Sequence, residues 1–181
     1  MKKKILVACL CVALAVLTIA GTTLAYLTAT TGPVKNTFTV GNIDITLTET
    51  TTDYKMVPGS TIAKDPKVTV KAGSEDCWLF VKVEKSTNLD SFIDYTIGSG
   101  WTALTGVDGV YYREVSAVAA DTDYAVLKDN RVTVKDTVTK PMMDAITNGT
   151  ANNPTLSFTA YAVQKSGVNT ATDAWAKFST T

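Results

Sequence analysis

Threonine alternates with β-branched and aromatic residues along most of this chain, and this spacing is the strongest constraint on its fold. Residues 67–71 and 131–134 both place an apolar side chain at every second position. Such alternation is typical of a half-buried β-strand, and β-branched and aromatic residues favour strands. Because turn-forming residues separate these runs, the sequence predicts an all-β fold, an antiparallel jelly-roll-like β-sandwich with one or two short helices.

Several elements of this sandwich can be placed along the chain. Residues 77–83 begin apolar on both faces, which is typical of a central strand, and residues 155–164 predict the last strong strand. Residues 57–60 predict a turn. Residues 141–146 predict a short helix, and a capping box that begins at Thr170 predicts another.

Two hairpins are also expected. Asp108 and Gly109 favour a two-residue turn between strands at residues 101–107 and 110–115, since both central positions of such a turn need a positive φ. A second hairpin is expected from the strand pattern that continues on both sides of residues 128–130. The sequence therefore predicts that these neighbouring strands pair with each other.

The N-terminus has the three parts of a secretion signal. Residues 2–4 are lysines, residues 5–20 are apolar, and small residues precede a cleavage site between Ala25 and Tyr26. A retained membrane anchor and a chain lipidated at Cys9 are the alternatives. The sequence predicts a signal peptide at residues 1–25 and one secreted domain at residues 26–181, with membrane contact only through the signal before cleavage.

Charge and composition argue against several classes of function. Removal of the three signal lysines changes a balanced chain into one of net charge −3, and no basic cluster remains to bind nucleic acid. The chain contains no histidine, which argues against His-dependent nucleophilic catalysis and histidine-ligated zinc. We therefore expect no catalytic site, no metal and no cofactor.

Three further features each have a plain structural explanation. Cys77 is the single cysteine after residue 25 and is expected to be a small buried side chain. The oxygen-rich loops could hold calcium, but such residues are ordinary turn formers. The large aromatics could form a glycan platform, but they more often pack in a core. These loops and aromatics are Asp121 and Asp123, Asn148, Asn152 and Asn153, and Trp78, Trp101, Tyr111, Tyr112 and Trp175.

The apolar side chains before and after Gly41 and Asn42 are expected on opposite faces of the strand. Apolar residues are even-numbered up to Val40 and odd-numbered from Ile43. A shift of one residue moves a side chain to the other face of a sheet, so a bulge or bend is expected at Gly41 and Asn42.

Short motifs in a fixed order resemble the TasA and camelysin (CalY) family of Gram-positive bacteria. They are Ala25-Tyr26-Leu27-Thr28, the run from Asn36 to Ile45, the segment from Pro58 to Pro66, and Thr159-Ala160-Tyr161-Ala162-Val163-Gln164 followed by Ala174-Trp175. The resemblance implies export through a SipW-type signal peptidase and a jelly-roll subunit of biofilm matrix fibres, at the cell surface or in the extracellular matrix. In that family an N-terminal strand completes the sheet of the next subunit.

The leading hypothesis is therefore a non-enzymatic fibre subunit that polymerises head to tail with itself, with or without an accessory matrix protein. The candidate donor strand is residues 26–40, and its apolar side chains are Tyr26, Leu27, Val34, Phe38 and Val40. Gly32-Pro33 interrupts this strand, since proline cannot donate to a ladder. The alternatives are a monomeric cell-surface module that binds a glycan or a protein, and a camelysin-like metalloprotease, which the missing histidine disfavours.

Overall fold

A computed structural model describes residues 41–51, 54–147 and 153–178 of the chain. They belong to the second of two compact units, Thr39–Thr181. The signal peptide, its cleavage site and the candidate donor strand lie outside the described residues. The all-β expectation is confirmed, because the described chain forms three antiparallel sheets with two short α-helices, α2 (Lys140–Thr147) and α3 (Ala171–Ala176).

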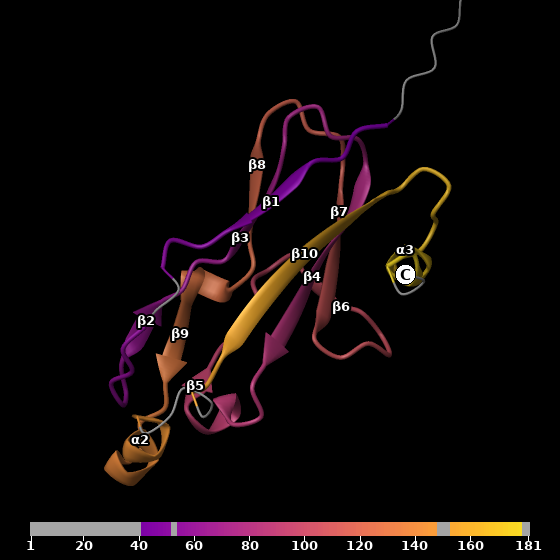
Figure 1. The fold of residues 1–181 in the computed structure, drawn as a ribbon. Coiled ribbons are helices and arrows are strands. Elements are labelled where there is room, and N and C mark those ends of the chain that lie inside the picture. The colour runs from indigo at the N-terminus through magenta and orange to yellow at the C-terminus, as the bar shows by residue number, and fades with distance from the viewer. Residues whose placement is uncertain (1–40, 52–53, 148–152, 179–181) are drawn as a thin grey trace, which may run out of the picture. The chain divides into compact units, whose positions relative to one another are not determined.

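One layer of the sandwich is a four-stranded sheet in the order β10-β4-β7-β6 (Figure 1). Its strands are Leu156–Gln164, Cys77–Lys85, Val110–Val115 and Thr102–Ala103, respectively. The two long strands, β10 and β4, pair along their whole length from Leu156 opposite Lys85 to Gln164 opposite Cys77. The expected strands at residues 77–83 and 155–164 are confirmed.

The facing layer consists of two three-stranded sheets, β1-β3-β8 and β2-β9-β5. Their strands are Ile45–Thr48, Lys67–Val70 and Thr122–Ala125, and Thr61–Ala63, Arg131–Val134 and Ile93–Asp94. β2 runs into β3 and β8 runs into β9, and each of these continuous segments pairs with the other in both halves. The two small sheets are thus the two halves of one bent layer.

β4 is buried on both faces because it separates two apolar layers. On one face Leu79 and Val81 pack with Val68 and Val70 of β3, in what we call the inter-sheet core. On the other face Trp78 and Phe80 pack beneath α3, with Ala171 and Ala174, in what we call the helix-covered layer. The continuous apolar run of residues 77–81 is therefore explained by burial on both sides.

A third group of apolar side chains lies between the β2-β9-β5 sheet and the first residues of β10. We call it the groove-side core. Its buried members come from the 3₁₀ turn η1 (Leu89–Ser91), from β5, β9 and α2, and from the segments next to these elements and before Lys128: Leu89, Phe92, Ile93, Leu127, Val132, Val134, Val138 and Ile146.

The loop between β6 and β7 is longer than the two-residue turn expected at Asp108 and Gly109. The strands end at Ala103 and begin at Val110, and only Gly109 of the expected pair has a positive φ, of 73°. Leu104 is buried in the helix-covered layer and its amide donates to the Val110 carbonyl at 2.8 Å. Burial of Leu104 therefore closes this hairpin several residues earlier than local turn chemistry indicates.

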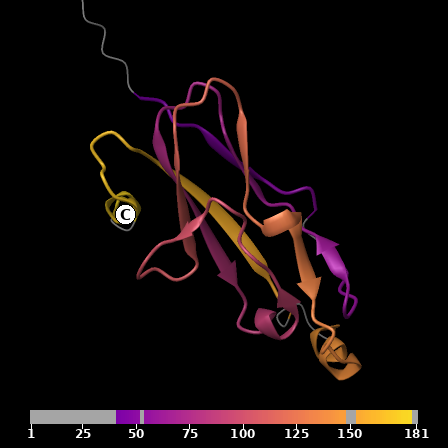
Figure 2. The ribbon, with the colours of Figure 1, turned by 180° about the vertical axis from the view of Figure 1, so that it is seen from behind.

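The second expected hairpin is wrong. β8 and β9 pair with β3 and β2 instead of with each other, and the 3₁₀ turn η2 (Lys128–Asn130) carries the chain round a corner between them (Figure 2, in orange). The corner is fixed by backbone bonds from Val126 to the Pro66 carbonyl, 2.9 Å, and from Lys64 to the Asn130 carbonyl, 2.9 Å. Pairing with the β2-β3 segment thus overrides the local tendency to turn back.

The smaller elements agree with the sequence. The turn at residues 57–60 is closed by a bond from the Ser60 amide to the Val57 carbonyl, 3.0 Å, with Gly59 at φ 74°. Thr170 caps α3 by accepting a hydrogen bond from the Asp173 amide, 3.1 Å. Within the described ranges, neither α-helix has the length and apolar character needed to cross a membrane.

Candidate functional site

Along one edge of the bent layer, one half has an outer strand and the other half does not, and we call this offset the step. β1 pairs with β3, but no strand of the described chain occupies the corresponding position beside β2, which pairs only with β9. In the other layer, β10 is an edge strand, and among the described residues it pairs only with β4. Two strands therefore present free hydrogen-bonding edges on the same side of the sandwich.

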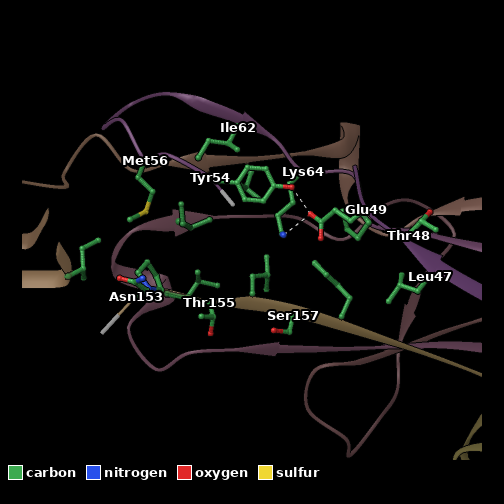
Figure 3. A pocket seen from close by; sticks show the side chains of 18 residues that line it. Leu47, Thr48, Glu49, Tyr54, Met56, Ile62, Lys64, Asn153, Thr155 and Ser157 are labelled. Atoms are coloured by element: carbon green, nitrogen blue, oxygen red, sulfur yellow. Dashed lines mark hydrogen bonds and ion pairs between the residues drawn. The ribbon is translucent and has the colours of Figure 1, made fainter. Parts of the chain in front are cut away.

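A groove lies between these two edges (Figure 3). Its volume is about 770 Å³. Its walls are formed by β2, by the segment that follows β1, and by the first residues of β10, and its floor is the groove-side core. The lining residues are Leu47, Thr48, Glu49, Tyr54, Met56, Ile62, Lys64, Pro66, Leu89, Ile93, Val132, Ile146 and residues 153–158.

The groove mixes apolar side chains with the hydroxyl and amide groups of Thr48, Asn153, Thr155 and Ser157, and its charged lining residues belong to one cluster. Lys64 follows β2 and is only 8% exposed, and its ammonium lies 2.7 Å from Glu49 Oε1. The Tyr54 hydroxyl donates to the same carboxylate oxygen at 2.7 Å. The Lys64 ammonium also faces the rings of Tyr54 and Phe158, whose centroids lie 4.9 and 5.5 Å away.

The side chains of this cluster are partly shielded from water, and this changes the pKa of Tyr54. Burial raises the pKa of the Tyr54 phenol well above its usual value, and the hydrogen bond to Glu49 and the charge of Glu49 add to that rise. Beside it, the Thr50 amide and hydroxyl both donate to the Asp65 carboxylate, which lowers the pKa of Asp65. The segment that follows β1 is thereby tied to the bend between β2 and β3.

The N-terminal segment joins the described domain far from this groove along β10. Asn42 accepts a backbone hydrogen bond from Glu75, 3.0 Å, and a side chain added at Gly41 would meet Glu75 and Gln164. Gln164 is the last residue of β10, whereas the groove is lined by the first ones, Leu156 to Phe158. The nine residues of β10 span roughly 27 Å at the usual strand rise.

The structure describes few of the site residues named from the sequence. Ala25, Tyr26, Leu27, Val34, Phe38 and Val40 lie outside the described residues. Gly41 and Asn42 are exposed and belong to no strand, and β1 begins at Ile45. The bend expected at Gly41 and Asn42 stays a prediction, because the residues before Gly41 are not described.

The groove residues themselves were not singled out in the sequence. Lys64 stands just before Asp65 and Pro66, and this polar context is typical of a solvated turn. Its burial depends on Glu49 and Phe158, which are distant in sequence. The sequence offers one weak signal for this site, the short strand-like pattern of residues 61–63 followed directly by a charged residue.

Several other features weighed from the sequence have structural contacts, whereas Asn148 and Asn152 lie outside the described residues. Asp121 and Asp123 form ion pairs with Lys71 and Lys67, at 2.9 and 2.8 Å. Cys77 is fully buried, and burial raises the pKa of its thiol to about 11. Trp78 and Trp101 are buried too. Within the described ranges, no three cysteine, aspartate or glutamate side chains cluster closely enough to hold a metal ion.

Comparison with protein-family models, with curated proteins and with solved structures finds no match for this chain. The fold and the groove define an all-β sandwich domain in which no strand of the described residues occupies the position beside β2.

Proposed function

We propose that this chain is a secreted structural subunit of an extracellular matrix fibre, in which residues 26–40 of one copy fill the groove of the next. The observation that carries the proposal is the step beside β2. A strand placed there would meet the free edge of β2 or of β10 and would cover the apolar floor. Extended segments bind other proteins in this way, with main-chain bonds giving affinity and side-chain pockets giving specificity.

The size of the groove supports a strand as its occupant. With strands about 4.8 Å apart, layers about 10 Å apart and a rise of about 3.4 Å per residue, 770 Å³ holds roughly five residues of strand. Residues 34–40 follow Pro33 without a further proline and alternate Val34, Phe38 and Val40 with threonine and lysine. The part of the candidate donor strand after Pro33 is therefore long enough to fill the groove.

The separation of the groove from Gly41 supports assembly between copies. The donor segment joins its own domain beside Gln164, and the groove lies at the other end of β10. A contact that joins two different surfaces does not close on itself unless the rotation happens to make a ring. The expected product of repeated strand donation is a linear head-to-tail polymer.

The experiment is electron microscopy of exported protein. The full chain is expressed in a Gram-positive host that cleaves the signal, beside a variant whose signal is followed directly by Gly41. This variant keeps every residue that the structure describes. Fibres from the first and folded monomers from the second are expected, whereas fibres from both would reject the proposed contact.

The groove also favours one alternative, a binding module for an extended peptide of another protein. Its volume lies within the range of ordinary ligand pockets, about 300–1,000 Å³. Such a module would stay monomeric at all concentrations even with residues 26–40 present. Sedimentation of the exported protein over a wide concentration range separates this alternative from a self-assembling subunit.

A further inference from the structure

The lining of the groove contains one pair of charged side chains, Lys64 and Glu49, and this pair has bonding capacity left. In the described part of the chain, the Lys64 ammonium makes one hydrogen bond, to Glu49 Oε1. An ammonium has three donors and a carboxylate two oxygens. Tyr54 shares the same Oε1, so Glu49 Oε2 and two protons of Lys64 are available to a further partner. Both residues line the groove (Figure 3).

After Pro33, the candidate donor strand carries one polar side chain on its otherwise apolar even-numbered face. Side chains two residues apart share a face of a strand, and on the even-numbered face Val34, Phe38 and Val40 are apolar. Asn36 lies between Val34 and Phe38 on that face. An apolar strand face with one central amide therefore matches a groove with an apolar floor and one charged pair in its lining.

The chemistry of an amide suits this pair. The carboxamide oxygen of asparagine accepts hydrogen bonds and its nitrogen donates two. It can therefore accept from the Lys64 ammonium and donate to Glu49 at the same time. An aliphatic side chain in that place would bury both charges without offering either bond, and an unmet buried polar group costs about 1–3 kcal/mol.

We propose that Asn36 of one copy bonds to the Lys64–Glu49 pair of the next copy and thereby sets the register of the strand in the groove. This inference rests on the proposed function. A slip of one residue turns the apolar face outward, and a slip of two places Val34 or Phe38 against the charged pair. Both errors are penalised, as a single buried asparagine penalises misalignment in other assemblies.

The first test compares fibre growth of the exported full chain with that of two single variants. Asn36→Leu is expected to raise the protein concentration needed for growth by about tenfold or more. Thr37→Val, on the other face of the strand, is the matched control and should change it little. Neither substitution touches a described residue. Growth of Asn36→Leu at the wild-type concentration would overturn the inference while leaving strand donation intact.

The second test exchanges the polar contact for an apolar one. Lys64→Met with Glu49→Leu removes the charged pair, and fibre growth should then be weak with Asn36 and recover when Asn36→Leu is added. Failure to recover in the folded triple variant contradicts register setting by this contact.

A third measurement does not depend on refolding a variant domain. A synthetic peptide of residues 33–41 should inhibit growth of wild-type fibres, and the same peptide with Asn36→Leu should need about tenfold more. Equal inhibition by the two peptides overturns the inference. Wild-type protein that forms no fibres would reject the proposed function and this contact with it.

Discussion

The indole nitrogen of Trp101 donates a 2.8 Å hydrogen bond to the backbone carbonyl of Ala125. Trp101 precedes β6 in the four-stranded layer, and Ala125 ends β8 in the bent layer. This bond therefore joins the two layers directly. Arg113 of β7 lies beside it, with its guanidinium 5.4 Å from the Trp101 ring and 4.2 Å from the Tyr124 ring.

Replacement of Trp101 by phenylalanine should lower the free energy of unfolding by about 2 kcal/mol, since the Ala125 carbonyl loses its partner and the smaller ring leaves a gap. Urea unfolding followed by circular dichroism measures the change. Tyr112→Phe, which keeps a ring of similar size in the helix-covered layer, is the control and should cost less. Equal losses in the two variants would mean that the bond between layers contributes little.

Removal of Lys64 alone should destabilise the domain more than removal of the pair. Lys64→Met leaves the Glu49 carboxylate nearly buried without its counter-ion, a change that costs about 3 kcal/mol or more. The double variant Lys64→Met, Glu49→Leu should recover most of that loss. Tyr54→Phe removes the hydroxyl that contacts Glu49 Oε1 and the Thr51 carbonyl but leaves the ion pair, and it should cost about 1 kcal/mol. Thermal and urea unfolding of the three variants provide the comparison.

The Cys77 thiol should make stability fall at alkaline pH. Its folded pKa of about 11 lies above the unfolded value of 9.0, so its contribution is complete below pH 9 and is lost as pH rises toward 11. The loss should reach about 2–3 kcal/mol. Other groups titrate in the same range, so the quantity to measure is the difference in slope between wild type and Cys77→Ala. Parallel curves for the two proteins would contradict this contribution.

A mixture of one variant with a defective donor strand and one with a defective groove should assemble only as far as a dimer. Phe38→Asp puts a charge into the donor strand, and Ile62→Asp puts one into the groove wall, so each variant alone should form no fibres. A mixture should yield a heterodimer, because one protein keeps a working strand and the other a working groove. Analytical ultracentrifugation of the separate and mixed proteins tests this. Fibres from the mixture, or from Phe38→Asp alone, would contradict the contact.

The strands could be predicted from the sequence because alternation is a local property. Residues 67–71 and 77–83 lie in strands, and the helix cap at Thr170 is formed as expected. Both faces of β10 contribute to the packing of the domain. Phe158 packs against the inter-sheet core and Tyr161 against the helix-covered layer.

The pairing of the strands and the groove could not be predicted, because both depend on residues that are distant in sequence. β8 and β9 turn a corner because β2 and β3 offer them partners some sixty residues earlier. The groove exists because β1 ends at Thr48, and β2 continues the layer with β9 on one side and no strand of the described chain on the other. Neither fact leaves a local pattern at the residues concerned.

The position of β4 between the inter-sheet core and the helix-covered layer has a consequence for unfolding. Leu79 on one face and Phe80 on the other are successive residues of the same backbone, and both are fully buried. A chain that releases β4 loses its contacts with α3 and with β3 in a single step. We therefore expect amide protons in the two layers to exchange with solvent through the same opening event, at one common rate under conditions where that opening is limiting.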